Sequence, residues 1–136
     1  MGRSVLLIED EPNIIEAISF LLSRDGWTVR IHSEGVGALD AVHRTQPDIV
    51  ILDVMLPGLS GFDVLREMRL DPATRDCPVL MLTARGQQKD RDLAESYGVN
   101  HFMTKPFSND EMVRTVRELA DRGSPPQAQA PAAGKS

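Results

Sequence analysis

The sequence predicts a doubly wound α/β domain, in which a five-stranded parallel sheet alternates with five helices. Two observations lead to this fold class. Short runs rich in Val, Ile and Leu recur along the chain, and segments with apolar residues at helical spacing lie between them. Three of the runs are nearly continuous in apolar residues, which is typical of strands covered on both faces.

Five apolar runs are the candidate strands. They are residues 5–8, 28–31, 49–52, 79–82 and 100–103. Turn-forming residues lie close to four of them: Gly26, Pro47, Pro78 and Gly98. The run at 28–31 alternates polar and apolar residues, so we expect it at an edge of the sheet.

The segments between the runs carry apolar stripes at helical spacing. The first stripe contains Ile14, Ala17, Ile18, Leu21 and Leu22, the second Val36, Leu39 and Val42, the third Phe62, Leu65 and Met68, and the last Met112, Val113, Val116, Leu119 and Ala120. Pro12 suits the first turn of the first helix, and Ser108 or Asn109 can cap the last. The remaining segment, 87–97, has only three apolar anchors, so it predicts a loosely held helix.

Residues 1–122 contain all of these elements and are expected to form one domain, a size that needs no disulfide or metal to fold. Residues 123–136 contain three Pro and four Ala but no aromatic or large aliphatic residue. Such a segment cannot bury enough apolar surface to offset the entropy of ordering. We therefore expect a disordered Pro/Ala-rich tail there.

The composition narrows the classes of function. A formal net charge of -5 disfavours a domain that binds nucleic acid by itself. No apolar run approaches the roughly 18 residues of a membrane span, and the N-terminus lacks the pattern of a signal peptide. The single cysteine, Cys77, excludes an internal disulfide and suits a reducing compartment. We expect a cytoplasmic protein that makes no contact with a membrane.

Polar and charged residues follow four of the five predicted strands. They are Glu9 and Asp10, Asp53, Thr83, and Lys105. Taken singly, the aspartates and the threonine could cap helices or favour turns, and the lysine could be solvated. However, the carboxyl ends of parallel strands meet at one edge of a sheet, where ligands bind in folds of this class. We therefore expect these side chains to converge.

Together these residues indicate a phosphoryl site with a bound cation. Three carboxylates repel one another unless a positive charge neutralises them. Mg²⁺ prefers oxygen ligands and needs only one or two carboxylates, and the chain has no His or Cys at the spacing of a zinc site. Lys105 and Thr83 can then bind phosphoryl oxygens. Asp53 ends the central strand and is the best candidate for a nucleophile that forms an acyl phosphate.

The sequence resembles the receiver domain of bacterial two-component response regulators. The resemblance covers residues 4 to about 122 and rests on five separated motifs in the family's order: residues 5–12, residues 48–57, Gly61, residues 78–84 and residues 104–107. It is closest to receivers that precede a winged-helix DNA-binding domain, notably through residues 74–76 and 82–86. The resemblance implies a flavodoxin-like strand order, 2-1-3-4-5.

The resemblance also implies roles for the acidic residues. Asp53 would accept a phosphoryl group from a phosphohistidine on a sensor kinase or a phosphotransfer protein. Asp10, Asp53 and the backbone carbonyl of Met55 would hold Mg²⁺ directly, and Glu9 would act mainly through water. Such a protein is not a turnover enzyme, although it assists its own phosphorylation and dephosphorylation.

The family's switch residues have counterparts in this chain as well. Thr83 and Lys105 would contact the phosphoryl oxygens, and Phe102 stands where the family places an aromatic switch residue. The helix at 87–97, the strand after it and the last helix would form the face that changes on phosphorylation. The Lys105–Pro106 peptide bond is usually cis in relatives.

The resemblance implies a downstream effector protein, or an output domain that these residues do not contain. DNA-binding relatives commonly carry an Asp–Asp pair before the switch aromatic and an Arg in the last helix, and these serve a symmetric dimer. Here the corresponding residues are Asn100, His101 and Thr115, although Arg91 and Glu111 could still pair. A homodimer on phosphorylation is therefore possible, in a form that differs from the usual one.

Two other classes of protein also place an acidic nucleophile or a phosphate-binding loop at the carboxyl end of a strand. A phosphohydrolase of the haloacid-dehalogenase kind needs a second Asp two residues after the nucleophile, where this chain has Met55. A flavodoxin-like cofactor binder needs a Ser/Thr/Gly-rich loop after its first strand. The residues at 9–11 are all acidic and would repel a phosphate.

Overall fold

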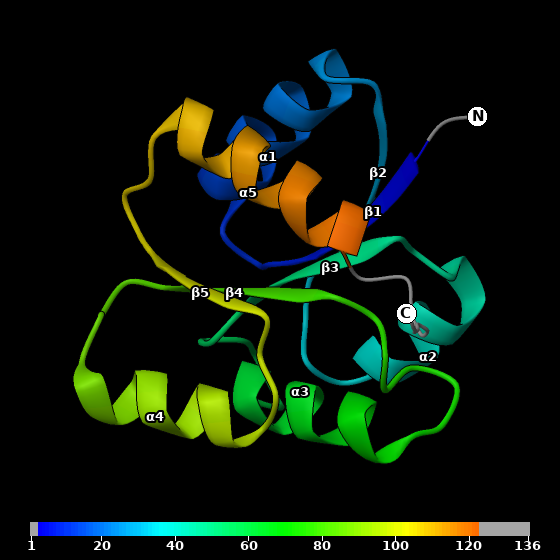
Figure 1. Ribbon diagram of the computed structural model, residues 1–136, viewed down its shortest axis with the longest axis vertical. Helices are drawn as coiled ribbons and strands as arrows, with labels where there is room; N and C mark the ends of the chain where they lie inside the picture. The colour runs from blue at the N-terminus through cyan, green and yellow to red at the C-terminus, as the bar shows by residue number, and fades with distance from the viewer. Residues whose placement is uncertain (1–2, 123–136) are drawn as a thin grey trace.

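The computed structural model describes residues 3–122 and confirms the predicted fold class. Five parallel strands form one sheet in the order β2-β1-β3-β4-β5, as the resemblance implies (Figure 1). The strands are β1 (Arg3–Ile8), β2 (Trp27–His32), β3 (Ile49–Asp53), β4 (Val79–Thr83) and β5 (His101–Thr104). The helices are α1 (Pro12–Arg24), α2 (Ala38–Thr45), α3 (Gly61–Leu70), α4 (Gln88–Ser96) and α5 (Asn109–Arg122). The expected tail at 123–136 lies outside the described residues.

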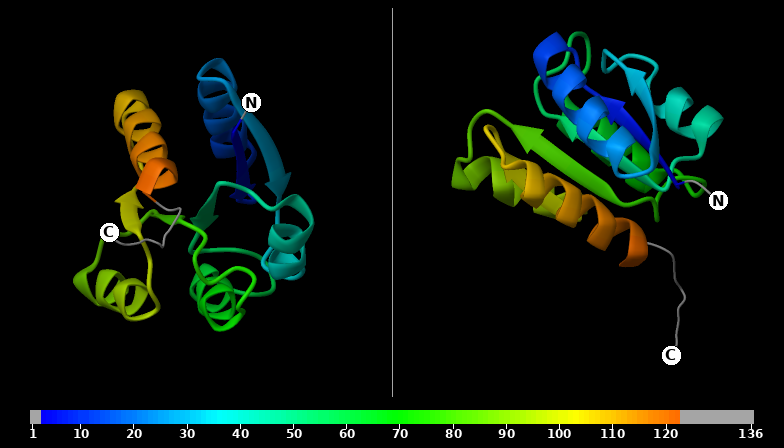
Figure 2. Two further views of the ribbon diagram at one scale, coloured as in Figure 1. Left: turned by 45° about the vertical axis from the view of Figure 1, so that its right-hand side comes forward. Right: turned by 90° about the horizontal axis from the view of Figure 1, so that it is seen from above.

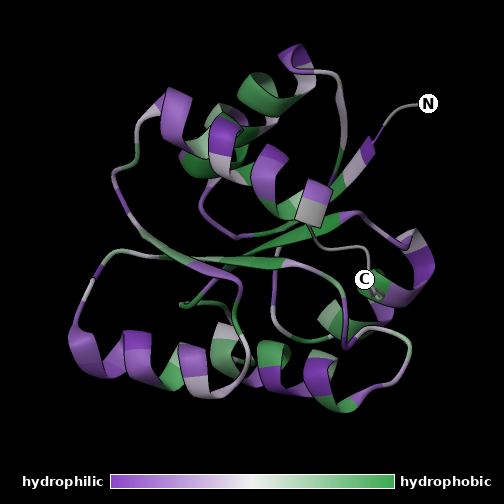
Figure 3. Ribbon diagram, viewed as in Figure 1, coloured by the Kyte–Doolittle hydropathy of each residue, from purple (hydrophilic) through white to green (hydrophobic). Residues whose placement is uncertain are grey.

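Helices cover both faces of the sheet, α1 and α5 on one face and α2, α3 and α4 on the other (Figures 1 and 2). Successive residues of a strand point to opposite faces. Leu6 and Leu52 belong to the apolar cluster under α2, α3 and α4, whereas Leu7 and Ile51 belong to the cluster under α1 and α5. Figure 3 shows the resulting pattern, with hydrophobic strands between helices that carry hydrophilic residues. This is why the central strands are continuous apolar runs.

The edge position predicted for the second run is confirmed, because β2 is the outermost strand next to β1. The second helix begins later than its predicted stripe. It begins at Ala38, after Gly37 with a φ of 79°, and Val36 lies before it in the loop with 58% of its surface exposed. Because the backbone of Gly37 is left-handed, the helix cannot extend back to include Val36.

The predicted caps have different outcomes. Ser108 Oγ accepts a hydrogen bond from the backbone N–H of Glu111 at 3.0 Å, so Ser108 caps α5. At α1, Glu11 rather than Asp10 occupies the N-cap, and no side-chain hydrogen bond caps the helix. Helix capping therefore does not explain why Asp10 follows the first strand.

The loosely held helix is confirmed as α4. Ala94 is its one buried residue, and Leu93 remains 39% exposed. A helix with so little buried apolar surface opens locally more readily than its neighbours. It packs beside α3 and covers the β5 end of the sheet (Figure 1).

Candidate functional site

The strand ends bring the predicted site residues to one edge of the sheet. Asp53 is the last residue of β3 and Thr83 is the last residue of β4. Glu9 directly follows β1, and Lys105 directly follows β5. Because β3 pairs in parallel with both β1 and β4, and β4 with β5, these residues lie side by side. The predicted convergence is confirmed.

Three carboxylates form a tight cluster at this edge. Glu9, Asp10 and Asp53 each offer an oxygen within 4.8 Å of the others. Glu9 and Asp53 are buried, whereas Asp10 is exposed. The cluster opens into a cavity of about 450 Å³. The cavity is lined by Asp10, Glu11, Pro12, Asp53, Met55, Ala84 and Lys105.

Lys105 extends its ammonium group into the acidic cluster. Its Nζ lies 3.3 Å from Glu9 Oε1, 3.5 Å from Asp53 Oδ1 and 3.5 Å from Glu11 Oε1. Burial alone would lower the pKa of Lys105, but the charges of Asp53, Glu9 and Glu11 outweigh burial and raise that pKa. Lys105 is therefore a fixed positive charge beside the Asp53 carboxylate.

Glu9 is a carboxylic acid in a poor environment for its ionised form. Burial raises its pKa to about 7, the nearby Asp53 carboxylate acts in the same direction, and the Glu11 N–H and Lys105 oppose them. Its Oε2 accepts a hydrogen bond from the Glu11 N–H at 3.2 Å. Its buried Oε1 forms no well-oriented hydrogen bond in the described part of the chain, and its one charged partner there is the Lys105 ammonium group at 3.3 Å. Three clustered carboxylates that share one ammonium group keep an excess of negative charge, and such an all-oxygen set fits a small, hard divalent cation.

Gly61 explains part of the geometry around Asp53. A Cβ atom on Gly61 would lie 2.1 Å from the backbone oxygen of Asp53, so only glycine fits there. The Gly61 N–H donates to the carbonyl of Val54 at 2.9 Å, which holds the start of α3 against the end of β3. Met55 lies in this connection, and its side chain is 74% exposed at the rim of the cavity.

Thr83 is buried and is not among the residues that line the cavity, although its neighbour Ala84 is. Its Oγ1 accepts a hydrogen bond from the Arg85 N–H at 3.1 Å. A hydroxyl that accepts one bond keeps its own proton for donation. The backbone N–H of Lys105 donates to the Thr83 carbonyl at 2.8 Å, and the Lys105–Pro106 peptide bond is cis, as the resemblance implies.

Phe102 lies in β5 with 8% of its surface exposed, inside the apolar cluster beneath α4. The guanidinium carbon of Arg91 lies 5.1 Å from the centre of its ring. Within one chain Arg91 forms no ion pair in the described residues, and its charged group lies against the ring of Phe102. The pairing of Arg91 with Glu111 concerns the face between two copies and stays a prediction.

Glu11 is the site residue that the sequence reasoning did not single out. It lines the cavity and contacts Lys105, although the reasoning used it only as part of an acidic run. Its position three residues beyond the first strand was the available signal. The helix start at Pro12 fixes where its side chain can reach.

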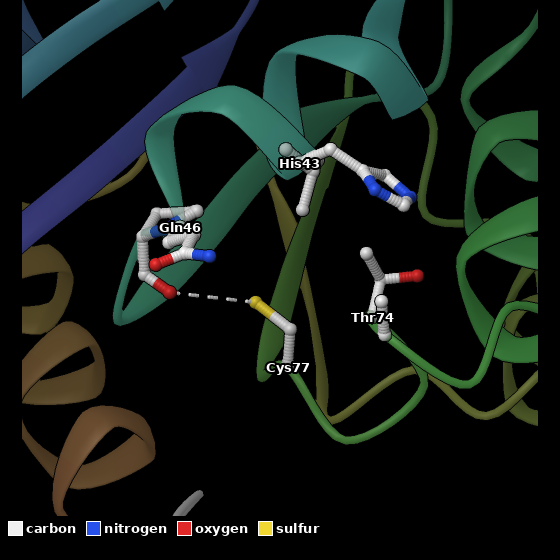
Figure 4. A pocket seen from close by; sticks show the side chains of 7 residues that line it. His43, Gln46, Thr74 and Cys77 are labelled. Carbon is white, nitrogen blue, oxygen red and sulfur yellow. Dashed lines mark hydrogen bonds between the residues drawn. The ribbon is translucent and has the colours of Figure 1, made fainter.

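A second cavity of about 240 Å³ lies away from the acidic cluster, between α2 and the loop before β4 (Figure 4). Its walls include His43, Gln46, Thr74 and Cys77. The Cys77 sulfur contacts the Pro47 carbonyl at 3.8 Å, and burial raises the pKa of this thiol to about 11. A protonated thiol is a weak nucleophile, so this cavity offers no reactive group comparable to Asp53.

The fold and the clustered strand-end residues define a receiver domain, the signalling module of two-component systems. Residues 5–117 match the family described as the response regulator receiver domain, and the chain belongs to that family. This membership favours the receiver over the phosphohydrolase and the flavodoxin-like cofactor binder. In the described residues, no helix is long and apolar enough to cross a membrane.

Several curated relatives are named as bacterial transcriptional regulatory proteins. The transcriptional regulatory protein TcrX of Mycobacterium tuberculosis is 40% identical over 119 residues, which are 88% of this chain and 50% of the relative. The phosphate regulon transcriptional regulatory protein PhoB of Escherichia coli is 37% identical over 125 residues, 92% of this chain and 55% of the relative. The likeness to receivers of DNA-binding regulators is thereby confirmed. The chain spans about half the length of the curated relatives it matches.

Solved structures agree in fold. The receiver domain of the sensor histidine kinase PA1611 from Pseudomonas aeruginosa has a TM-score of 0.82 and 30% identity, covering 89% of this chain and 99% of that chain. That structure has a magnesium ion coordinated in its active-site cleft. The signal receiver domain of a signal transduction histidine kinase from Syntrophus aciditrophicus has a TM-score of 0.84 and 25% identity. The match covers 96% of this chain and 99% of that chain.

Proposed function

We propose that this chain is a phosphorylation-controlled switch of a two-component phosphorelay, in which Asp53 accepts the phosphoryl group. One observation supports this assignment above the others. The Asp53 carboxylate stands at the end of the central strand, 3.5 Å from Lys105 Nζ, in a cluster with Glu9 and Asp10. A nucleophile, a fixed cation and a metal-binding acidic pair are the parts that phosphoryl transfer to a carboxylate needs.

In the transfer, an oxygen of the Asp53 carboxylate attacks the phosphorus of a phosphohistidine on the donor protein. A P–O bond forms while the P–N bond breaks, and the imidazole nitrogen leaves with the electron pair of that bond. Asp53 becomes an acyl phosphate. Lys105 places its positive charge next to the oxygens of the incoming group.

The residues for Mg²⁺ in this proposal are Asp10, Asp53 and the backbone carbonyl of Met55, with Glu9 acting through water. When bound, the ion neutralises charge between the carboxylates and the phosphoryl oxygens. The three clustered carboxylates, whose negative charge exceeds that of the single Lys105 ammonium group beside them, support this assignment. The magnesium in the receiver domain of PA1611 supports it as well.

Thr83 and Phe102 carry the switch in this proposal. A phosphoryl group adds about 1.5 to 2 negative charges, and the Thr83 hydroxyl can donate to one of its oxygens. Moving a two-state equilibrium from 1:99 to 99:1 takes about 5.5 kcal/mol. Two to three charge-assisted hydrogen bonds, at about 1.5 to 3 kcal/mol each, supply that amount. Phe102 then repacks, and the face formed by α4, β5 and α5 changes.

The same site returns the chain to its resting state. Water attacks the phosphorus, the bond between phosphorus and the Asp53 oxygen breaks, and the carboxylate and inorganic phosphate are released. The chain thus assists its own dephosphorylation without turning over an external substrate.

The wider proposal follows the two-component scheme. The receiver spans residues 1–122, and the protein acts in the cytoplasm. A sensor histidine kinase or a phosphotransfer protein supplies the phosphoryl group, and an effector protein or an output domain reads the changed face. The receiver does not itself bind nucleic acid or a membrane, and it can form a homodimer when phosphorylated.

Phosphorylation by acetyl phosphate in the presence of Mg²⁺ tests the proposal. We expect intact-mass spectrometry to show one added phosphoryl group on the wild-type chain and none on Asp53→Asn. Asp40→Asn is the matched control, because Asp40 lies on α2, away from the acidic cluster, and its ion pair among the described residues is with Arg44 at the surface. An unmodified wild type, or equal modification of Asp53→Asn, would overturn the assignment.

A further inference from the structure

Arg91 joins α4 to the ring of Phe102 in β5. The guanidinium carbon lies 5.1 Å from the ring centre, within the roughly 6 Å at which a cation is attracted to an aromatic face. Phe102 is nearly buried, so the Arg91 side chain covers a ring that has little other access to solvent. Arg91 itself is half-buried, so its cation keeps part of its hydration and the contact has the strength of a partly exposed one.

The contact matters because α4 has few other attachments. Ala94 is its one buried residue, and Arg91 forms no ion pair within residues 3–122. Figures 1 and 2 show α4 at the β5 end of the sheet, away from the helices that cover the other face. The charge of Arg91 is therefore directed to β5 and not to a carboxylate on a neighbouring helix.

The loop before α4 packs at the same place. A Cβ atom on Gly86 would lie 2.5 Å from Thr104 Cγ2 and 3.7 Å from Arg91 Nη2. The loop backbone thus approaches both β5 and the guanidinium group closely. Thr83, which begins this loop, accepts from Arg85 through its hydroxyl. The loop that runs from the Thr83 hydroxyl to α4 thus passes close to β5 and to the side chain that covers Phe102.

We infer that the contact of the Arg91 guanidinium group with the Phe102 ring, which we call the latch, couples α4 to the switch residue Phe102. The inference rests on the proposed function, because it concerns how the change at Thr83 and Phe102 reaches α4. Arg91 acts through Phe102 and is a positioning residue. Without the latch, β5 can respond to the phosphoryl group while α4 no longer follows it.

Hydrogen–deuterium exchange of the α4 amides tests the latch in the resting protein. We expect Arg91→Gln to speed exchange of residues 88–96 by about two- to fivefold, the factor that corresponds to a partly exposed cation–π contact. Lys89→Gln removes the same charge from an exposed position on the same helix and leaves exchange unchanged. Arg91→Lys keeps the charge and restores part of the protection.

A double-mutant cycle with Phe102→Leu shows whether the ring is the partner. In the Phe102→Leu background, Arg91→Gln causes no further acceleration, because the contact is already absent. Equal acceleration in both backgrounds, or an Arg91→Gln chain that behaves like Lys89→Gln, would overturn the latch.

Beryllofluoride with Mg²⁺ tests the coupling itself. In the wild type we expect exchange to change in both β5 and α4, and in Arg91→Gln we expect β5 to respond while the α4 response is lost. An undiminished α4 response in Arg91→Gln contradicts the coupling. Failure of acetyl phosphate to modify the wild type at Asp53 contradicts the proposed function instead, and the resting-state cycle still reports on the latch.

Discussion

Titration of Glu9 is expected to make the metal-free protein less stable at neutral pH than in mild acid. Burial and the neighbouring Asp53 raise the pKa of Glu9 from 4.5 to about 7 in the folded chain. The folded state therefore holds the Glu9 proton more tightly than the unfolded state does. The resulting stabilisation is complete below about pH 4.5 and is lost as the pH rises through about 7.

The size of the effect follows from the shift. One pKa unit corresponds to about 1.4 kcal/mol, so a shift from 4.5 to about 7 corresponds to about 3 kcal/mol of unfolding free energy. Lys105 does not oppose this trend, because its own raised pKa keeps it charged throughout the range. Glu9→Gln removes the titrating group and keeps a side chain of similar shape.

Urea unfolding at about pH 5 and about pH 8, with a chelator present, measures the effect. Trp27 is the chain's one tryptophan and is buried, so its fluorescence reports unfolding. We expect the wild type to lose about 2 to 3 kcal/mol more than Glu9→Gln between these pH values. The comparison cancels the titration of groups outside the cluster, and parallel pH profiles for the two proteins would refute the reasoning.

Three further predictions concern the metal, α3 and the strand end. Mg²⁺ at a hundredfold excess over its Kd should stabilise the wild type by about 2.7 kcal/mol in thermal unfolding, and Asp10→Asn should lose most of this gain. Arg69 donates to the carbonyls of Gly98, Arg75 and Cys77 and to Asn100 Oδ1, so Arg69→Met should cost about 2 to 4 kcal/mol in urea unfolding, with exposed Arg66→Met as the control. Gly61→Ala should displace the end of β3, because its Cβ would lie 2.1 Å from the Asp53 oxygen, and should slow modification by acetyl phosphate more than it changes Mg²⁺ affinity. Unchanged behaviour of any of these variants would contradict the contact on which its prediction rests.

The strands and the site edge were readable from the sequence because they depend on local patterns. A strand covered on both faces must be apolar throughout, and a parallel sheet must bring its strand ends together, so the neighbourhood of Glu9, Asp53 and Lys105 follows from their positions in the chain. The start of α2 could not be predicted from the sequence in the same way. Val36 continues the apolar spacing of that helix, but the left-handed backbone at Gly37 places it in the loop.

Contacts between distant segments could not be predicted in this way. The position of Glu11 beside Lys105 depends on where α1 begins and on the path of the loop after β5. The contact of Arg91 with the ring of Phe102 depends on how α4 packs on β5. Neither contact can be predicted from residue spacing or composition, because each joins side chains on elements that are far apart in the sequence.

Mapping of the phosphorylated residue tests the central proposal most directly. After treatment with acetyl phosphate and Mg²⁺, the chain is digested in acid, and the peptide that contains Asp53 is identified by mass spectrometry. We predict one phosphoryl group on that peptide, removed by hydroxylamine as an acyl phosphate is, and absent when a chelator replaces Mg²⁺. A phosphoryl group on any other peptide, or a modification that resists hydroxylamine, would contradict the assignment of Asp53 as the phosphoacceptor.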